Sequence, residues 1–184
     1  MLRLLTDRLE LKPLPAQTAA ALPEDREAAS RALGSRLSAE WPDPHLLGVL
    51  RHHAGAPVDT ECFGVWVMIE CCSGTVVGDL GFRGPPDDGG TIELGYSVIP
   101  SRRGRGYATE AASALVRWAA SQPRVDVIVA GCDPNNVPSV RTLERVGFAG
   151  PAKPTARSDG AIAATATCDQ IVGGSLREKG QCPV

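Results

Sequence analysis

The chain has no long apolar run. No stretch approaches the roughly 18 consecutive apolar residues of a membrane-spanning helix. Its first residues, Met1–Lys12, alternate charged and apolar side chains and contain neither an apolar core nor a small-residue cleavage site, so they do not resemble an export signal. A basic excess is also missing, because the formal net charge is −2, which argues against a nucleic-acid coat protein. These absences predict a cytoplasmic protein with no membrane and no nucleic acid among its partners.

Patterns for metals and disulfides are missing as well. The six cysteines contain no C-x-x-C spacing, and the three histidines lie at no ligand spacing from them. Without an export signal, we expect all six cysteines to be reduced thiols, and we expect no metal site. What remains is ordinary: 184 residues, 43% hydrophobic and 22% charged, are typical of one globular domain.

The spacing of apolar residues predicts a mixed α/β order: a strand, helical segments, three strands, a helix, a strand and a helix. We expect strands at Thr6–Leu14, Phe63–Glu70, Val76–Phe82, Thr91–Ile99 and Val125–Ala130. We expect helices at Glu24–Leu37, Tyr107–Ser121 and Pro138–Val146. Trp66 and Trp118 are expected in the core.

The last part of the chain differs from the rest. All eight aromatic residues lie at or before Phe148, and the segment 149–184 is rich in Ala, Thr, Gly and Pro with weak periodicity. Only Ala161–Ile171 suggests a strand there. We therefore expect a domain over residues 1–148 and an atypical C-terminal segment over residues 149–184. A degraded hairpin, a dimer arm and a flexible tail all fit this segment.

The strongest local signal is the hexapeptide Arg103-Gly104-Arg105-Gly106-Tyr107-Ala108, which lies between a predicted strand and a predicted helix. The first N–H groups of a helix have no partner within the helix, and glycine lets the main chain approach a ligand closely. Such a turn binds a phosphate or pyrophosphate. A Walker loop is excluded because no G-x-x-x-x-G-K-[ST] is present, and a Rossmann fingerprint lacks its third glycine. A tight turn with solvated arginines is the simpler alternative.

The hexapeptide matches Q/R-x-x-G-x-G/A, the acetyl-coenzyme A motif of the GNAT (Gcn5-related) N-acetyltransferases, and the chain resembles this superfamily. The flanking segments Glu93–Tyr96 and Ala108–Ala111 are similar too. Asp133–Ser139, with Leu143 and Gly147-Phe148 further on, resembles the RimJ/RimL-like branch that acetylates ribosomal-protein N-termini. Asp7–Leu14 is similar to that branch's first strand. The resemblance covers roughly residues 5–148.

The resemblance implies a GNAT fold: a mixed, mostly antiparallel sheet with helices on both faces, splayed between the parallel strands Thr91–Ile99 and Val125–Ala130. It implies acetyl-CoA as cofactor. Hydrogen bonds to the pantetheine arm would come from Val98 and Ile99, and Asn136 and Ser139 would hold the thiol end. The pyrophosphate would bind the N–H groups of Arg103, Gly104, Arg105, Gly106, Tyr107, Ala108 and Thr109.

The implied reaction is direct transfer of acetyl to a primary amine, either a protein N-terminus or a small molecule. Glu93 is the candidate base, acting through a water; the alternative is a solvated strand residue. Ser139 is the candidate partner of the leaving thiolate, because the predicted helix lacks the Tyr that many relatives use. For Ser139 the alternative is helix capping, and for Asn136 a turn.

Two further possibilities are compatible with the sequence. A GNAT-fold module that binds acetyl-CoA without turnover, as a sensor or a partner-binding subunit, is the alternative function. A homodimer is compatible with the sequence, although no residue argues for it. The acceptor amine is not identified, because the segment after Phe148 lacks the aromatic and charged strand residues that shape the acceptor side in the family.

Overall fold

The computed structural model describes residues 2–53, 62–151, 162–167 and 178–179. Within them, ten strands form one mixed sheet, in which β3 pairs with β5 beside the main path β10-β1-β2-β4-β5-β6-β7-β9-β8. The strands are β1 (Arg3–Leu5), β2 (Leu9–Pro13), β3 (Arg36–Leu37), β4 (Val65–Glu70), β5 (Thr75–Phe82), β6 (Thr91–Val98), β7 (Val127–Cys132), β8 (Ala149–Pro151), β9 (Ile162–Thr167) and β10 (Glu178–Lys179).

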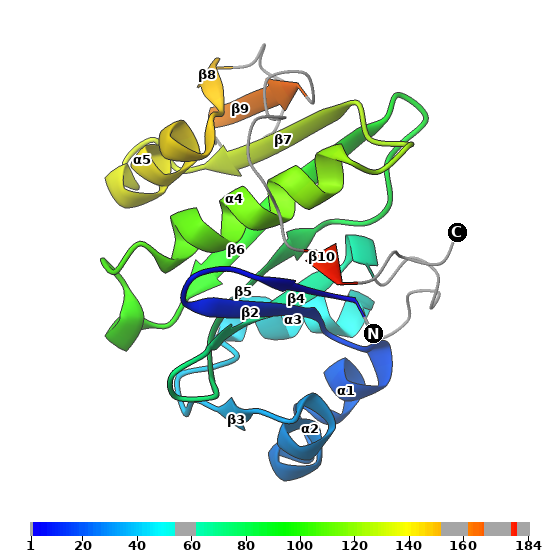
Figure 1. The fold of residues 1–184 in the computed structure, drawn as a ribbon, viewed down its shortest axis with the longest axis vertical. Helices are drawn as coiled ribbons and strands as arrows, with labels where there is room; N and C mark the ends of the chain where they lie inside the picture. The colour runs from blue at the N-terminus through cyan, green and yellow to red at the C-terminus, as the bar shows by residue number, and fades with distance from the viewer. Residues whose placement is uncertain (1, 54–61, 152–161, 168–177, 180–184) are drawn as a thin grey trace.

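Helices cover both faces of this sheet (Figure 1). They are α1 (Ala16–Ala21), α2 (Arg26–Leu33), α3 (Pro44–His53), α4 (Tyr107–Ala120) and α5 (Val137–Val146), with a short 3-10 turn, η2 (Pro100–Arg102), before α4. Trp118 of α4 packs on Trp66 of β4 with ring centroids 5.2 Å apart. On the opposite face, Trp41, just before α3, donates a hydrogen bond to Asp79 of β5. The predicted mixed α/β fold with helices on both faces is confirmed.

The core is one cluster of buried residues, to which the sheet, α4 and the helices α1, α2 and α3 contribute. Trp66 and Trp118 are 0% and 2% exposed, which confirms the expectation that both belong to the core. Ala111, Ala112 and Leu115 of α4 are fully buried.

The central feature of the sheet is the divergence of β6 and β7. These parallel strands pair only from Thr91↔Val127 to Leu94↔Ala130. Beyond Leu94, β6 keeps its antiparallel pairing with β5 as far as Val98. β7 continues instead with β9, from Val127 to Cys132. The predicted splay between the two parallel strands is therefore present, and it opens toward the segment that leads into α4.

Two expectations about local structure were wrong, and one strand was missed. The helix expected over Glu24–Leu37 is shorter, because Gly34 adopts φ 62° and ends α2, and Arg36–Leu37 then pair with β5 as β3. A strand before Thr6, β1, was not expected. Cys62 is disulfide-bonded, so it is not a reduced thiol, whereas Cys71, Cys72 and Cys132 are free.

The described strands after residue 148 join the same sheet. β8 pairs with β9, which lies within the expected strand Ala161–Ile171 and itself pairs with β7. β10 pairs with β1 at the other end of the sheet. The remaining residues of the segment lie outside the described part of the chain.

Candidate active site

The main-chain groups of alternate residues at the end of β6 face the gap between β6 and β7. The N–H of Ile99, just after β6, donates to the Val77 carbonyl of β5, and its own carbonyl accepts from the N–H of Arg102. Because hydrogen-bonding directions alternate along a strand, the main-chain groups of Tyr96 and Val98 are turned the other way, toward β7. The main chain of Val98 thus faces the splay, where its carbonyl already accepts from Arg103 Nε, while both main-chain groups of Ile99 are used inside the protein.

The segment from Gly104 to Thr109 forms an amide-rich turn where the splay opens. In the described part of the chain, no hydrogen bond engages the main-chain N–H groups of these residues. The helix hydrogen bonds of α4 begin at Glu110, whose N–H donates to the Gly106 carbonyl. Gly104 and Gly106 have φ 72° and 80°, a conformation that favours glycine, and a Cβ at Gly104 would meet nothing within 4 Å. This is an open anion cradle at a helix N-terminus.

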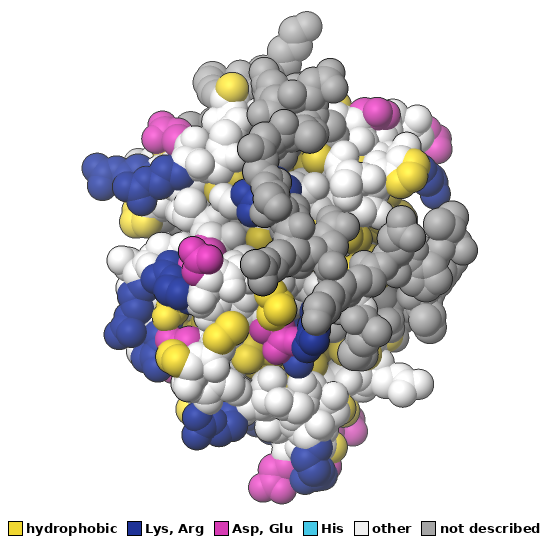
Figure 2. Space-filling view, viewed as in Figure 1, with side chains coloured by type: hydrophobic (Ala, Val, Ile, Leu, Met, Phe, Trp, Pro, Cys, Tyr) yellow, Lys and Arg dark blue, Asp and Glu magenta, His cyan; other side chains and the backbone are white. Residues whose placement is uncertain are grey.

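Positive charge surrounds the cradle. Arg103 and Arg105 are exposed and Arg102 is half-buried. In Figure 2, Lys and Arg side chains gather along the left edge, where Figure 1 draws the turn between β6 and α4. Arg103 also turns back to donate from Nε to the Val98 carbonyl at 2.9 Å, which links the cradle to the end of β6. The arrangement suits a ligand with several phosphate charges.

Across the splay, a side-chain hydrogen bond joins β6 to α5. The Tyr96 hydroxyl lies 2.8 Å from Ser139 Oγ, where either oxygen could be the donor, and 3.2 Å from the Ser139 carbonyl. Burial raises the pKa of Tyr96, which keeps the phenol protonated at neutral pH. Asn136 caps α5 by accepting from the Ser139 N–H at 3.3 Å. The cap is therefore Asn136, and the Ser139 hydroxyl faces Tyr96 instead.

Glu93 lies on β6 within its last pairs with β7, opposite Val129. Its Oε1 forms an ion pair with Arg83 Nε at 3.0 Å, and the Glu93 side chain is 25% exposed. Arg83 also donates its N–H to the Glu93 carbonyl. The carboxylate is thus held near the point where the strands part and keeps access to water, as a base acting through a water requires.

A second acidic group lies on the same face of the sheet as Glu93, because its cross-strand partner Ser97 is four residues beyond Glu93 on β6. Asp79 is paired in register with Ser97 and accepts from Trp41 Nε1 at 2.8 Å, and the Ser97 hydroxyl donates to Asp43 at 3.1 Å. Burial, opposed in part by the Trp41 hydrogen bond, raises the pKa of Asp79 to about 7. Sequence reasoning missed this group. The available signal was a single carboxylate in the apolar strand β5.

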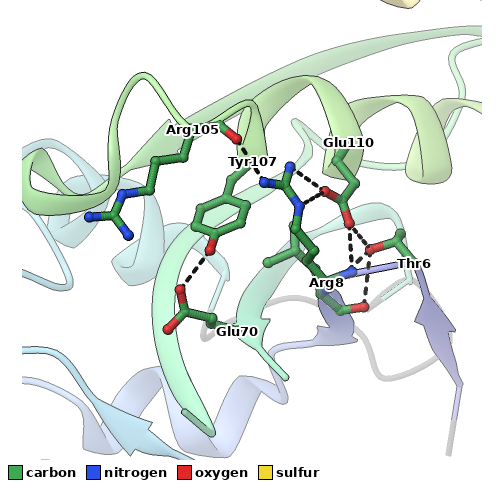
Figure 3. A network of polar contacts seen from close by, with 7 residues as sticks. Thr6, Arg8, Glu70, Arg105, Tyr107 and Glu110 are labelled. Carbon is green, nitrogen blue, oxygen red and sulfur yellow. Dashed lines mark hydrogen bonds and ion pairs between the residues drawn. The ribbon is translucent and has the colours of Figure 1, made fainter. Parts of the chain in front are cut away.

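The N-terminus of α4 is anchored by side chains that sequence reasoning also missed (Figure 3). Tyr107 Oη donates to Glu70 Oε1 at 2.6 Å, and Ser73 donates to the other oxygen of Glu70. Those two hydrogen bonds, aided by the Arg102 charge, hold the pKa of Glu70 at about 2 in spite of burial. Arg102 Nε lies 3.4 Å from Glu70 Oε1, an ion pair that lacks hydrogen-bond geometry. The carboxylate at the end of β4 therefore fixes the first residue of α4.

A mixed sheet that splays between two parallel strands, with an amide cradle where they part, is the architecture of a GNAT acetyltransferase. The chain belongs to the acetyltransferase (GNAT) domain family, whose sequence profile matches residues 8–149. The family makes the protein an N-acetyltransferase, as the sequence resemblance predicts.

Individual relatives agree with this assignment. The chain is 34% identical over 155 residues to the uncharacterized N-acetyltransferase YjdG of Bacillus subtilis, covering 80% of this chain and 90% of YjdG. Its fold is similar to an acetyltransferase from Agrobacterium tumefaciens, with 26% identity, a TM-score of 0.60 and coverage of 89% and 93%. RimJ of Mycobacterium smegmatis, solved with CoA-disulfide, is 24% identical with a TM-score of 0.59 and coverage of 94% and 88%. That last similarity concerns the fold.

Two features are absent from the described residues. None of the helices in these residues combines the length and the apolar character needed to cross a bilayer. His, Cys, Asp and Glu side chains in the same residues form no group of three with the geometry of a metal site.

Proposed function

We propose that the protein transfers an acetyl group from acetyl-CoA directly to a primary amine, which is either a protein N-terminus or a small molecule. The observation that carries the proposal is the run of unengaged N–H groups from Gly104 to Thr109 at the mouth of the splay. A diphosphate is the ligand that such a run accommodates best. Bound there, acetyl-CoA supplies an activated thioester.

The cofactor-binding residues follow from this geometry. The N–H groups of Gly104 to Thr109 would hold the diphosphate, with charge added by Arg103 and Arg105. The N–H of Val98, turned toward the splay, would bind the pantetheine arm as an added strand does, while the Val98 carbonyl stays with Arg103 Nε. The donor set contains the groups that a diphosphate and an amide-bearing arm need.

Two side chains at the splay have separate roles in the proposed reaction. Through a water, Glu93 takes a proton from the acceptor ammonium, so that the neutral amine attacks. An α-amino group has a pKa of about 7.7–8.0 against about 10.4 for a lysine, and a protein N-terminus therefore needs less help from the base. The Ser139 hydroxyl accepts from the Tyr96 hydroxyl and so keeps its own proton for a hydrogen bond to the leaving sulfur. Asn136 acts by capping α5 and so fixing the position of Ser139.

The proposal also covers the division of the chain and its amine partner. We assign the acetyl-transfer chemistry to residues 1–148 and the acceptor specificity in part to residues 149–184. The amine acceptor is the partner that the reaction requires. A cytoplasmic location and the homodimer remain predictions from the sequence.

The proposal is tested by following CoA thiol release from acetyl-CoA over a panel of N-terminal peptides, amino acids, polyamines and aminoglycosides. We expect release that depends on the amine, with mass spectrometry showing an acetylated acceptor. Tight CoA binding with no release for any amine would favour the non-catalytic module. Absence of CoA binding would contradict the cradle itself.

A further inference from the structure

The hairpin of β1 and β2 reaches the cradle through one arginine. Arg8 Nη1 donates to the carbonyl of Arg105 at 2.9 Å, although 97 positions separate the two residues in the sequence. Figure 3 shows the Arg105 carbonyl turned toward this guanidinium while the Arg105 side chain points away from it. The contact is therefore made with the main chain of the cradle.

This contact determines where one N–H of the cradle points. A trans peptide is planar, with its C=O and N–H directed oppositely. Because the Arg105 carbonyl is drawn toward Arg8, the N–H of Gly106 is directed away from Arg8. That N–H is one of those with no partner in the described part of the chain. The Gly106 φ of 80° allows the peptide to take this orientation.

The guanidinium that holds the peptide is itself fixed. Glu110 Oε2 accepts a hydrogen bond from Arg8 Nε at 2.7 Å and forms an ion pair with Nη2 at 2.6 Å, so all three nitrogens of the fork are in contact with partners. Glu110 Oε1 accepts from the Arg8 N–H at 2.9 Å and from the Thr6 hydroxyl at 2.6 Å. Burial favours protonation of Glu110, but these hydrogen bonds outweigh it and leave its pKa lowered. The ring of Tyr107 lies 4.7 Å from the guanidinium carbon.

We propose that Arg8 is a positioning residue for the cofactor, which fixes the Arg105–Gly106 peptide so that the Gly106 N–H is directed at the bound diphosphate. The inference rests on the proposed function, since it takes the diphosphate of acetyl-CoA as the ligand. Because Glu110 already neutralises the Arg8 charge at 2.6 Å, the contribution is orientation and not attraction of the anion. A single charge on a flexible stem cannot reproduce a planar three-donor fork.

The test compares CoA affinity, by calorimetry well below the unfolding temperature, in the wild type, Arg8→Ala, Arg8→Lys and Arg3→Ala. Arg3 is the matched control, because it forms an exposed ion pair with Glu10 on the same hairpin at 3.2 Å and does not touch the cradle. We expect both Arg8 variants to raise the Kd about 10-fold, the effect of losing one charge-assisted hydrogen bond, while Arg3→Ala stays within about 2-fold.

Two further readouts separate positioning from stability. In steady-state assays, Arg8→Ala should raise the KM for acetyl-CoA and leave kcat at saturation nearly unchanged. In ¹⁵N-labelled protein, the Gly106 amide resonance should shift in Arg8→Lys. Wild-type affinity in Arg8→Lys would show that charge suffices and would overturn the proposal, as would unchanged affinity in Arg8→Ala. Failure of the wild type to bind CoA would contradict the proposed function instead.

Discussion

Asp79 should make the stability of this protein fall as the pH rises through neutrality. The carboxyl is 6% exposed, and its pKa of about 7 compares with about 3.9 in an unfolded chain. Between these two pH values the native state binds a proton that the unfolded state does not. The contribution to stability is therefore complete below about pH 4 and is lost as the pH rises through 7.

The size of the effect follows from the two pKa values. Linkage gives a loss of about 2.6 kcal/mol between pH 5 and pH 8 from this group alone. Asp79→Asn removes the titration and keeps an oxygen that accepts from Trp41 Nε1. The free energy of unfolding of Asp79→Asn, relative to the wild type, should therefore increase by about 2.6 kcal/mol over the same interval.

The assay is urea denaturation at pH 5, 6, 7 and 8, followed by circular dichroism. Asp88→Asn is the matched control, because Asp88 is exposed and should leave the wild-type pH dependence intact. Wild-type tryptophan fluorescence should also titrate near pH 7, through Trp41, and this change should be absent from Asp79→Asn. Parallel pH profiles for the wild type and Asp79→Asn would refute the reasoning.

The active site gives three more predictions. Gly106→Ala and its control Gly34→Ala each force a left-handed conformation on an L-residue, at a cost of about 1–2 kcal/mol. Calorimetry should show that CoA affinity is lost only in Gly106→Ala. Equal CoA affinities in the two variants would contradict the cradle. Glu93→Gln should lower the rate chiefly below the pKa of the acceptor amine, whereas Glu144→Gln, on exposed α5 surface, should not; an unchanged pH–rate profile would remove Glu93 as the base. Ser139→Ala should lower kcat about 10²-fold with little change in the KM for acetyl-CoA, and an unchanged kcat would show that Ser139 does not assist the leaving sulfur.

Most elements of the fold were predictable because each carries its own pattern. The dense apolar run of β4 and the one-sided spacing of α4 are local signals, and both elements lie where the sequence predicts them. β1 and β3 have three and two residues, too few for an alternation to show. Such short strands form because a neighbouring strand offers partners, and that information lies elsewhere in the chain.

The two halves of the candidate site differ in the same way. The cradle is built from consecutive main-chain groups, and its requirement for positive φ appears in the sequence as Gly104 and Gly106. The side-chain part of the candidate site depends on contacts between residues that are distant in the sequence, such as Tyr96 and Ser139, which lie 43 positions apart. Glu93 and Ser139 were named as site residues from the sequence, but their pairing with Arg83 and Tyr96 was not predicted.

The anchoring of the cradle combines both kinds of information. Gly106 makes the necessary backbone conformation accessible, but a glycine also admits many others, so the residue that permits the cradle does not by itself define it. The conformation of the cradle is fixed by Arg8 and Glu70. Arg8, just before β2, holds the Arg105 carbonyl, and Glu70, at the end of β4, holds the Tyr107 hydroxyl. A substitution at either anchor should therefore act on the affinity for the diphosphate while the thioester end, built on β6 and α5, keeps its geometry.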